Sequence, residues 1–108
     1  MKAETKVDSK RVSMMFKALS DEVRVKILCQ LMESEQCACY LLKKQKMTQP
    51  MLAYHMQILC ASGLVESRRV GRWTYYALSR EGMIEAQNIT QQFLHSTKND
   101  PFCNISCC

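Results

Sequence analysis

The spacing of apolar residues predicts two helices in the first third of the chain. From Lys10 to Leu19 apolar side chains recur every three or four residues, as on a helix that buries one face. Ser20 is the predicted N-cap of a second helix, whose first turn contains acidic residues that suit the positive end of the helix dipole. We expect this helix to reach about Ser34 and to bury four apolar residues, Ile27, Leu28, Leu31 and Met32.

The middle of the chain is predicted to form two shorter helices joined by a tight turn. The first fits Cys39–Lys46. Thr48 is the predicted N-cap of the second, Gln49–Ala61, because Pro50 then falls in the first turn, where its missing N–H costs no hydrogen bond. Gly63 is placed to end this helix as a left-handed cap.

Two segments rich in strand-forming residues follow. They are Leu64–Val70 and Trp73–Leu78, and Gly71 lies between them in what we expect to be a hairpin turn. Helical spacing returns from Arg80 to about Thr97. The predicted order is α-α-α-α-β-β-α, which is mainly α with one β-hairpin.

Length and composition indicate a single folded domain. The chain has 108 residues, of which 47% are hydrophobic and only five are Gly or Pro. Periodicity stops at the segment KNDPFCNISCC, where Pro101 argues against a continued helix. We therefore expect a domain over residues 1–97 and a flexible, cysteine-bearing tail over residues 98–108.

Positive charge is concentrated in one segment. The formal net charge is +5, and the stretch from Tyr40 to Leu78 carries all of this excess, with six bases and one acid. A local basic surface favours a polyanion such as DNA or an anionic membrane, although a merely solvated charged face has the same composition. Charge alone therefore leaves the partner open.

The sequence also bears on the compartment of the protein. No apolar run approaches the roughly 20 residues of a membrane span, and the N-terminal segment lacks the apolar core of a secretion signal, so we expect a cytoplasmic protein without a membrane partner. Seven cysteines in a reducing compartment, an odd number, do not suggest a disulfide framework. Metal binding, redox sensing and burial remain as their possible roles.

Two short helices with a tight turn, followed by a basic hairpin, are the layout of a winged helix-turn-helix. In such a fold the second helix reads DNA bases, and the basic hairpin, or wing, lies against the DNA backbone and adds salt-dependent affinity. For His55 a structural role and a phosphate contact remain equally open. The residues expected to contact DNA are Thr48, Gln49, Met51, Ala53, Tyr54, His55 and Gln57 on the helix, and Arg68, Arg69 and Arg72 on the wing.

The segment from Glu35 to Leu78, about 44 of the 108 residues, resembles the ArsR/SmtB family of metal-responsive repressors. The resemblance lies in TQPMLAYHMQIL, SGLV and RRVGRWTYYAL, and FKALSDEVRVKIL nearer the N-terminus is similar too. It implies a homodimer, built on the first and last helices, that binds an imperfect inverted repeat in operator DNA and is released by metal. One departure is Ala53, where the family often has Ser. DNA binding itself is expected to need no cofactor.

Cys37 and Cys39 are the predicted metal ligands. Thiolates select thiophilic ions over hard ones, and within the family a Cys-x-Cys pair at this place resembles both arsenic and antimony sensors and cadmium and lead sensors. We expect As(III) or Sb(III) as inducer, with Cd(II), Pb(II) or Zn(II) as the alternative. The third cysteine of the arsenic-sensor pattern is replaced by Leu42, so a tail cysteine is a candidate third ligand: Cys103, Cys107 or Cys108.

The remaining cysteines have a different expected role. Cys29 and Cys60 are predicted to pack in the core. The family's other metal site, on the last helix, is expected to be missing, because Arg80, Gly82, Phe93 and Ser96 occupy its positions.

Side chains two apart on a helix diverge, so we expect that one ion can hold Cys37 and Cys39 only if the helix start unwinds. A thiol redox switch on the same scaffold and a metal-binding protein that does not bind DNA are the alternatives. No grouping of residues has the spacing of a catalytic motif, so we do not expect an enzyme.

Overall fold

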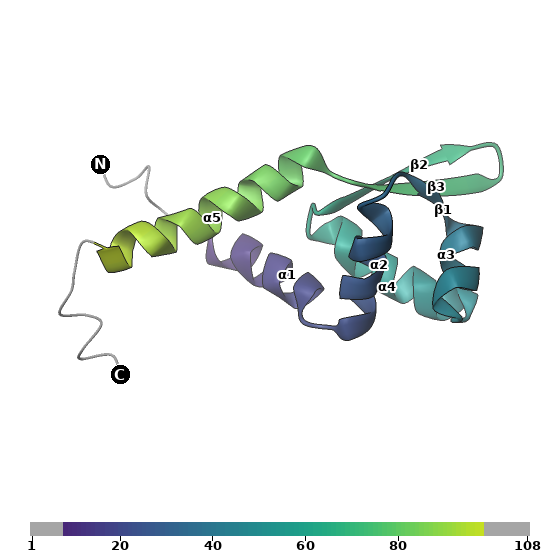
Figure 1. Ribbon diagram of the computed structural model, residues 1–108, viewed down its shortest axis with the longest axis horizontal. Coiled ribbons are helices and arrows are strands. Elements are labelled where there is room, and N and C mark those ends of the chain that lie inside the picture. The colour runs from purple at the N-terminus through teal and green to yellow at the C-terminus, as the bar shows by residue number, and fades with distance from the viewer. Residues whose placement is uncertain (1–7, 99–108) are drawn as a thin grey trace.

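A computed structural model describes residues 8–98 of the chain, with side chains up to residue 93. It contains five helices and three short strands in this part of the chain (Figure 1). The elements are α1 (Ser9–Leu19), α2 (Glu22–Leu31), β1 (Gln36–Cys37), α3 (Ala38–Gln45), α4 (Gln49–Ala61), β2 (Val65–Val70), β3 (Trp73–Leu78) and α5 (Arg80–Lys98). The predicted winged helix-turn-helix is confirmed.

The first two helices are capped by aspartates. Asp8 accepts a hydrogen bond from the Arg11 N–H at 3.3 Å, and Asp21 accepts one from the Val23 N–H at 2.7 Å. The predicted N-cap at Ser20 was therefore one residue too early, since Ser20 closes α1 by donating its N–H to the Lys17 carbonyl.

Helix α2 is shorter than the sequence pattern predicted. It ends at Leu31, and Met32, which was expected to be buried, has 72% of its surface exposed. Met32 is the C-cap residue, so the chain leaves the helix at this point and turns toward β1 instead of extending the buried stripe.

The helix-turn-helix consists of α3 and α4. Lys46 adopts a left-handed conformation with φ of 53° and ends α3, so that α4 begins within a few residues. The Thr48 hydroxyl accepts a hydrogen bond from the Met51 N–H at 3.3 Å, which confirms Thr48 as the N-cap of α4. Gly63 is also confirmed in a left-handed conformation after α4, with φ of 85°.

The sheet has three strands rather than the two predicted. All neighbours are antiparallel and the order is β1-β3-β2. Gly71, with φ of 64°, lies in the β2–β3 turn. The added strand β1 pairs Gln36 with Tyr76 and Cys37 with Tyr75. A two-residue strand has no periodicity of its own, because only its pairing with a distant strand defines it.

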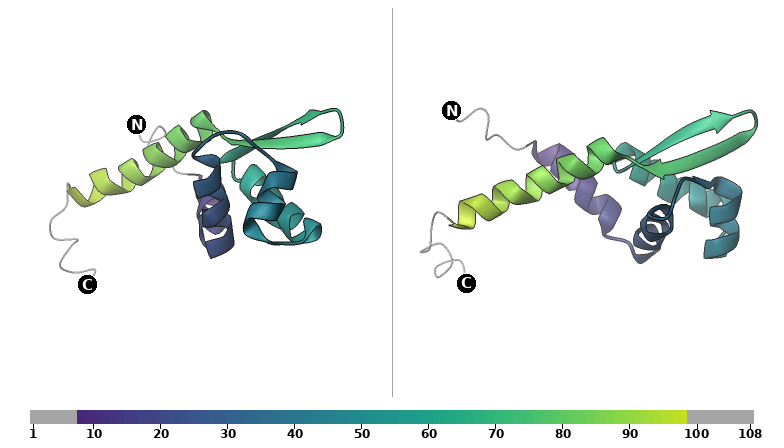
Figure 2. Two further views of the ribbon diagram at one scale, coloured as in Figure 1. Left: turned by 45° about the vertical axis from the view of Figure 1, so that its right-hand side comes forward. Right: turned by 45° about the horizontal axis from the view of Figure 1, so that its top comes forward.

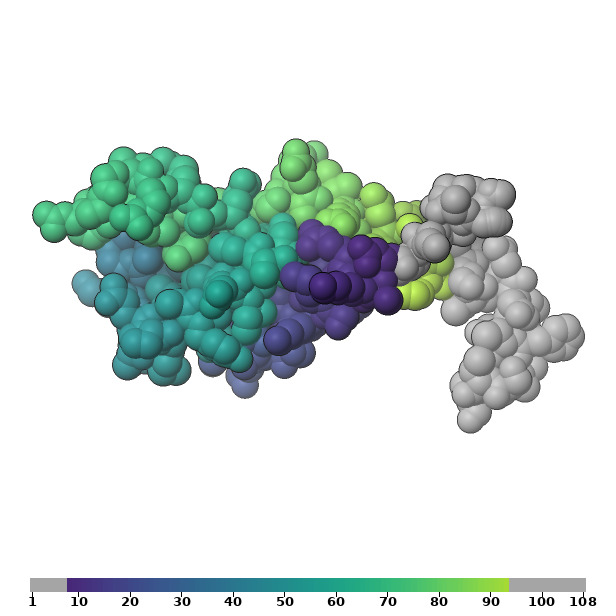
Figure 3. Space-filling model, turned by 180° about the vertical axis from the view of Figure 1, so that it is seen from behind, coloured from purple at the N-terminus to yellow at the C-terminus, as the bar shows by residue number. Residues whose placement is uncertain are grey.

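The core lies between α1, α2, α3, α4 and the start of the hairpin. Its buried apolar residues come from each of these elements: Met15, Ala18, Ile27, Leu28, Leu31, Leu41, Leu52, Met56, Leu59, Leu64 and Val65. Figures 1 and 2 show that the wing projects from one end of this body, while α5 crosses near α1 and runs away in the other direction. The space-filling view shows the same separation of wing and terminal helix (Figure 3).

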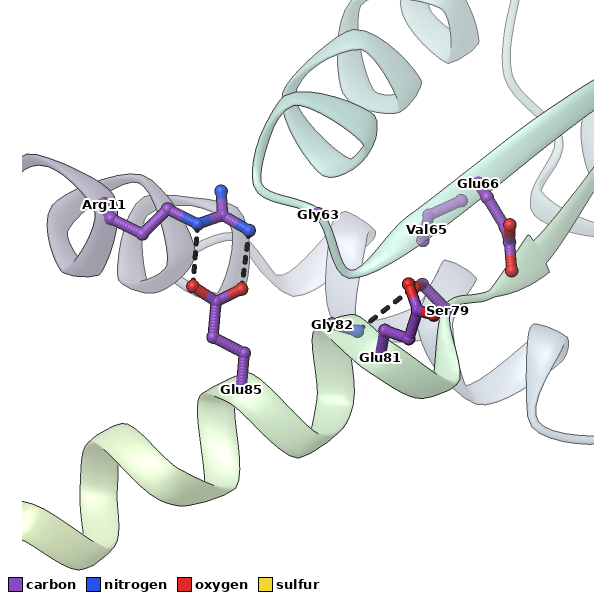
Figure 4. Close-up of a pocket in the computed structure, with 8 residues that line it drawn as sticks. All are labelled: Arg11, Gly63, Val65, Glu66, Ser79, Glu81, Gly82 and Glu85. Atoms are coloured by element: carbon purple, nitrogen blue, oxygen red, sulfur yellow. Dashed lines mark hydrogen bonds and ion pairs between the residues drawn. The ribbon is translucent and has the colours of Figure 1, made fainter.

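Helix α5 starts at a close backbone crossing. Ser79 caps it by accepting a hydrogen bond from the Gly82 N–H at 3.0 Å (Figure 4). A Cβ atom at Gly82 would overlap the Gly63 carbonyl oxygen and lie 2.7 Å from its carbon. Only glycine therefore lets α5 pass this turn at the observed distance.

Candidate DNA interface and cysteine pair

Helix α4 presents a continuous exposed face. Met51 and Tyr54 have 47% and 58% of their surfaces exposed. The other predicted base-reading residues on this face, Gln49, Ala53 and Gln57, are exposed as well. Amide and aromatic side chains at a capped helix N-terminus, ahead of a basic wing, suit insertion into a major groove. Thr48, also predicted to contact DNA, is exposed and uses its hydroxyl as the helix cap.

His55 points the other way, into the protein. It is 7% exposed, and its Nδ1 lies 3.0 Å from Nη1 of the buried Arg24. Arginine can only donate, so Nδ1 accepts and the ring is neutral with its proton on Nε2. Of the two roles left open for His55, this geometry matches the structural one, and the ring is not on the exposed face of α4.

Arg24 was not singled out from the sequence. Its guanidinium also donates to the carbonyl oxygens of Ala18 and Lys17, at 3.0 Å each, and so connects the end of α1 to α4. Its burial could have been predicted from its position: Arg24 lies three residues before Ile27, which places it on the apolar stripe of α2. A charged residue on such a stripe predicts a buried hydrogen-bonding partner.

The three wing arginines are exposed but differ in their contacts. Arg68 forms a two-pronged ion pair with Glu35, with Nε–Oε2 and Nη2–Oε1 distances of 2.7 and 2.8 Å, and these bonds lower the pKa of the Glu35 carboxyl. Its guanidinium also lies 5.1 Å from the centre of the Tyr75 ring. Arg69 and Arg72 form no ion pair within the described part of the chain.

Cys37 and Cys39 are brought together at the start of α3. Cys37 belongs to β1 and is the N-cap of α3, with extended backbone angles of φ −75° and ψ 146°. Its Sγ accepts a hydrogen bond from the Cys39 N–H at 3.3 Å. The two Cα atoms are 5.4 Å apart and the sulfurs are joined as a disulfide. Cys37 precedes the first helical residue, so the two sulfurs meet here without any unwinding of α3.

A third ligand is not found near this pair. Leu42 is half-buried and packs against the core. Across the described residues no group of three or more His, Cys, Asp or Glu side chains could hold an ion. The predicted tail ligands Cys103, Cys107 and Cys108 lie outside the described residues. The site therefore supplies two soft donors from this part of the chain.

The other two described cysteines differ from each other. Cys60 packs against the core as predicted, and burial raises the pKa of its thiol. Cys29 is exposed, so its predicted burial was wrong. It lies one position beyond the buried Leu28, on the outer side of α2 with Val25 and Met32, which are 40% and 72% exposed.

Helices α1 and α5 both expose large apolar side chains. Phe16, Leu19, Ile84 and Phe93 have between 41% and 50% of their surfaces exposed. The two helices are joined by an ion pair between Arg11 and Glu85, with Nη2–Oε1 and Nε–Oε2 distances of 2.8 and 3.0 Å (Figure 4). Hydrogen bonds from Arg11 lower the pKa of the Glu85 carboxyl.

A helix-turn-helix with an exposed second helix and a basic wing defines a DNA-binding transcription regulator rather than an enzyme. Residues 21–67 match the family described as "Bacterial regulatory protein, arsR family". An arsenical resistance operon repressor of Staphylococcus xylosus is 40% identical over 67% of this chain and 69% of its own length. A cadmium resistance transcriptional regulatory protein CadC homolog of Staphylococcus aureus is 34% identical over 78% of this chain and 69% of its own length. The chain belongs to the ArsR family.

Solved structures agree with this assignment. An ArsR-like transcriptional regulator from Rhodococcus sp. RHA1 superposes with a TM-score of 0.74 at 29% identity, over 90% of this chain and 91% of the other.

The sequence match does not extend over the full length of every relative. An arsenical resistance operon repressor of Bacillus subtilis is 37% identical over 61% of this chain, and the match covers 64% of that relative's length. None of the described helices is long and apolar enough to cross a membrane.

Proposed function

We propose that this protein is a homodimeric repressor that binds operator DNA and leaves it when a thiophilic ion binds Cys37 and Cys39. As(III) or Sb(III) is the proposed inducer. The observation that carries the proposal is the placement of the two sulfurs side by side at the N-terminus of α3, the first helix of the DNA-binding unit. A structural change at Cys37 and Cys39 acts directly on α3, the helix that supports α4.

The chemistry of the pair suits a soft ion. A Cα separation of 5.4 Å allows two thiolates to hold one ion once the bond between the sulfurs is reduced. The N-terminal end of α3 favours negative charge on Cys37 Sγ, which already accepts the Cys39 N–H. Relatives named for arsenical and for cadmium resistance support As(III) as the first choice and Cd(II) as an alternative. Pb(II) and Zn(II) are further alternatives because they too are thiophilic. We propose a tail cysteine as third ligand.

The proposed DNA complex uses α4 and the wing. The exposed face of α4 would read base edges, while Arg69 and Arg72 would contact phosphates. Exposed apolar residues on α1 and α5 support a homodimer, since a patch of this kind marks an interaction surface. Two such recognition helices suit an imperfect inverted repeat. We place this regulator in the cytoplasm, where operator DNA lies.

A titration of labelled inverted-repeat DNA tests the proposal. The reduced protein should bind with a log–log salt slope near −5 for about six phosphate contacts, and arsenite should release the DNA. Cys37→Ser, Cys39→Ser and a chain ending at Pro101 should bind DNA normally but respond less to arsenite, because each loses a proposed ligand.

The same titration separates the alternatives. A complex that survives saturating arsenite but dissociates with cadmium would make cadmium the inducer. Release by peroxide but not by metals would favour thiol redox sensing, which the contact between the two sulfurs also allows: two thiols and one peroxide yield one disulfide and two waters. Absence of salt-dependent binding to any duplex would refute the DNA-binding proposal.

A further inference from the structure

The cysteine pair and the wing share one sheet. Strand β3 pairs with β1 on one side and β2 on the other, and Figures 1 and 2 show β1 beside the wing. Tyr75 is the register partner of both Cys37 and Arg68. The three residues therefore form a single row across the sheet, with a proposed metal ligand at one end and a wing arginine at the other.

A side-chain contact also links the segment before Cys37 to the wing. Glu35 lies two residues before Cys37 and holds Arg68 through two hydrogen bonds of 2.7 and 2.8 Å. Because a carboxylate and a guanidinium are both planar, a paired contact of this kind fixes their relative orientation as well as their distance. The position of the segment before Cys37 is thus tied to the position of β2.

Among the three wing arginines, only Arg68 is held in this way within the described part of the chain. Arg69 is the next residue along β2, so its side chain points to the opposite face of the sheet. The ion pair is also solvent-accessible, with 58% and 34% of the Arg68 and Glu35 side chains exposed. Such pairs contribute little to folding stability, so this contact can be removed without unfolding the domain.

We propose that the ion pair between Glu35 and Arg68 transmits the inducer signal from the cysteine pair to the wing. The inference rests on the function proposed above. The two sulfurs, which touch in this structure, would part to admit an ion between them, and a shift of Cys37 would carry β1 and Glu35 with it. Glu35 then draws Arg68 and β2 with it through the intact ion pair, and the wing leaves its DNA-binding position. The coupling needs only a contact with two arrangements that metal and DNA favour differently.

Glu35→Gln tests this proposal. The variant removes the ion pair but keeps both cysteines, so its metal-free DNA affinity should stay within about threefold of the native protein and its affinity for arsenite should be unchanged. Effectors commonly change affinity by about 5–150-fold. We expect the arsenite-induced loss of DNA affinity in Glu35→Gln to fall to less than a third of the native value. DNA binding is measured by fluorescence anisotropy, and metal binding by the thiolate charge-transfer absorbance.

Glu66→Gln is the matched control, since it removes one negative charge from the same wing strand without touching the ion pair. Arg68→Lys should lose the arsenite response as Glu35→Gln does, because lysine keeps the charge but loses the paired geometry, whereas Arg69→Lys should keep it. For both arginine variants the response is measured relative to the variant's own metal-free DNA affinity. A full response in Glu35→Gln, or an equal loss in Glu66→Gln, would overturn the proposal. Failure of the native protein to release DNA would instead refute the proposed inducer function.

Discussion

A buried arginine and histidine determine how α4 is attached to the rest of the domain. Arg24 uses its guanidinium to bind two carbonyl oxygens at the end of α1 and Nδ1 of His55 on α4. The sequence pattern left the role of His55 open because a histidine within a recognition helix suits both packing and phosphate contact. Only the partner across the core, which is 31 residues away in sequence, distinguishes the two.

His55→Phe should destabilise the domain by about 1–3 kcal/mol, because it leaves one buried donor of Arg24 without an acceptor. Urea unfolding measures this change. Gln57→Ala is the control on the exposed side of α4, and it should change stability by less than about 0.5 kcal/mol while weakening DNA binding. Native stability of His55→Phe together with lost DNA affinity would assign His55 to phosphate contact after all.

At the scale of elements, the sequence predicted those helix and strand bounds that are determined by residues close together in the chain. The bounds of α4 and β3 were predicted correctly because Thr48, Pro50 and the wing turn mark them. Cys29 was misplaced because it borders the buried stripe of α2, and one helical position, about 100°, separates it from Leu28. Strand β1 and the contact between the two sulfurs depend on pairing with β3, which no local pattern reveals.

The crossing of α5 over the Gly63 turn is a close backbone contact between elements. Gly82→Ala should destabilise the domain by about 1–3 kcal/mol or more, because the new methyl group meets backbone atoms of Gly63 and Leu64, which cannot rotate away. Thermal unfolding followed by circular dichroism measures the change. Gln87→Ala, at an exposed site in the same helix, should have little effect. Equal stability of both variants would mean that α5 can shift at no cost.

At the scale of the whole molecule, the wing and the C-terminal part of α5 point in opposite directions (Figure 1), and exposed apolar residues lie on α1 and α5. This arrangement suits a dimer whose contact lies away from the DNA surface. Replacing Phe16 and Phe93 together by Glu should give a monomer in analytical ultracentrifugation and should weaken operator binding at least tenfold, because one half-site supplies only part of the affinity. Met32→Glu, at an apolar residue that directly follows α2 and is 72% exposed, should remain dimeric. A dimer that persists in the double variant would place the interface elsewhere.

The glycine at the start of α5 has a consequence for the DNA sequence as well. In the proposed dimer, the direction in which α5 leaves Gly82 fixes the path from the wing to the dimer axis, and so fixes how far apart the two copies of α4 lie. Recognition helices of a symmetric dimer meet successive major grooves about 34 Å apart, or about 10 base pairs. Gly82 has a hydrogen atom where alanine would have a methyl group, and this small side chain therefore influences how many base pairs separate the two halves of the operator.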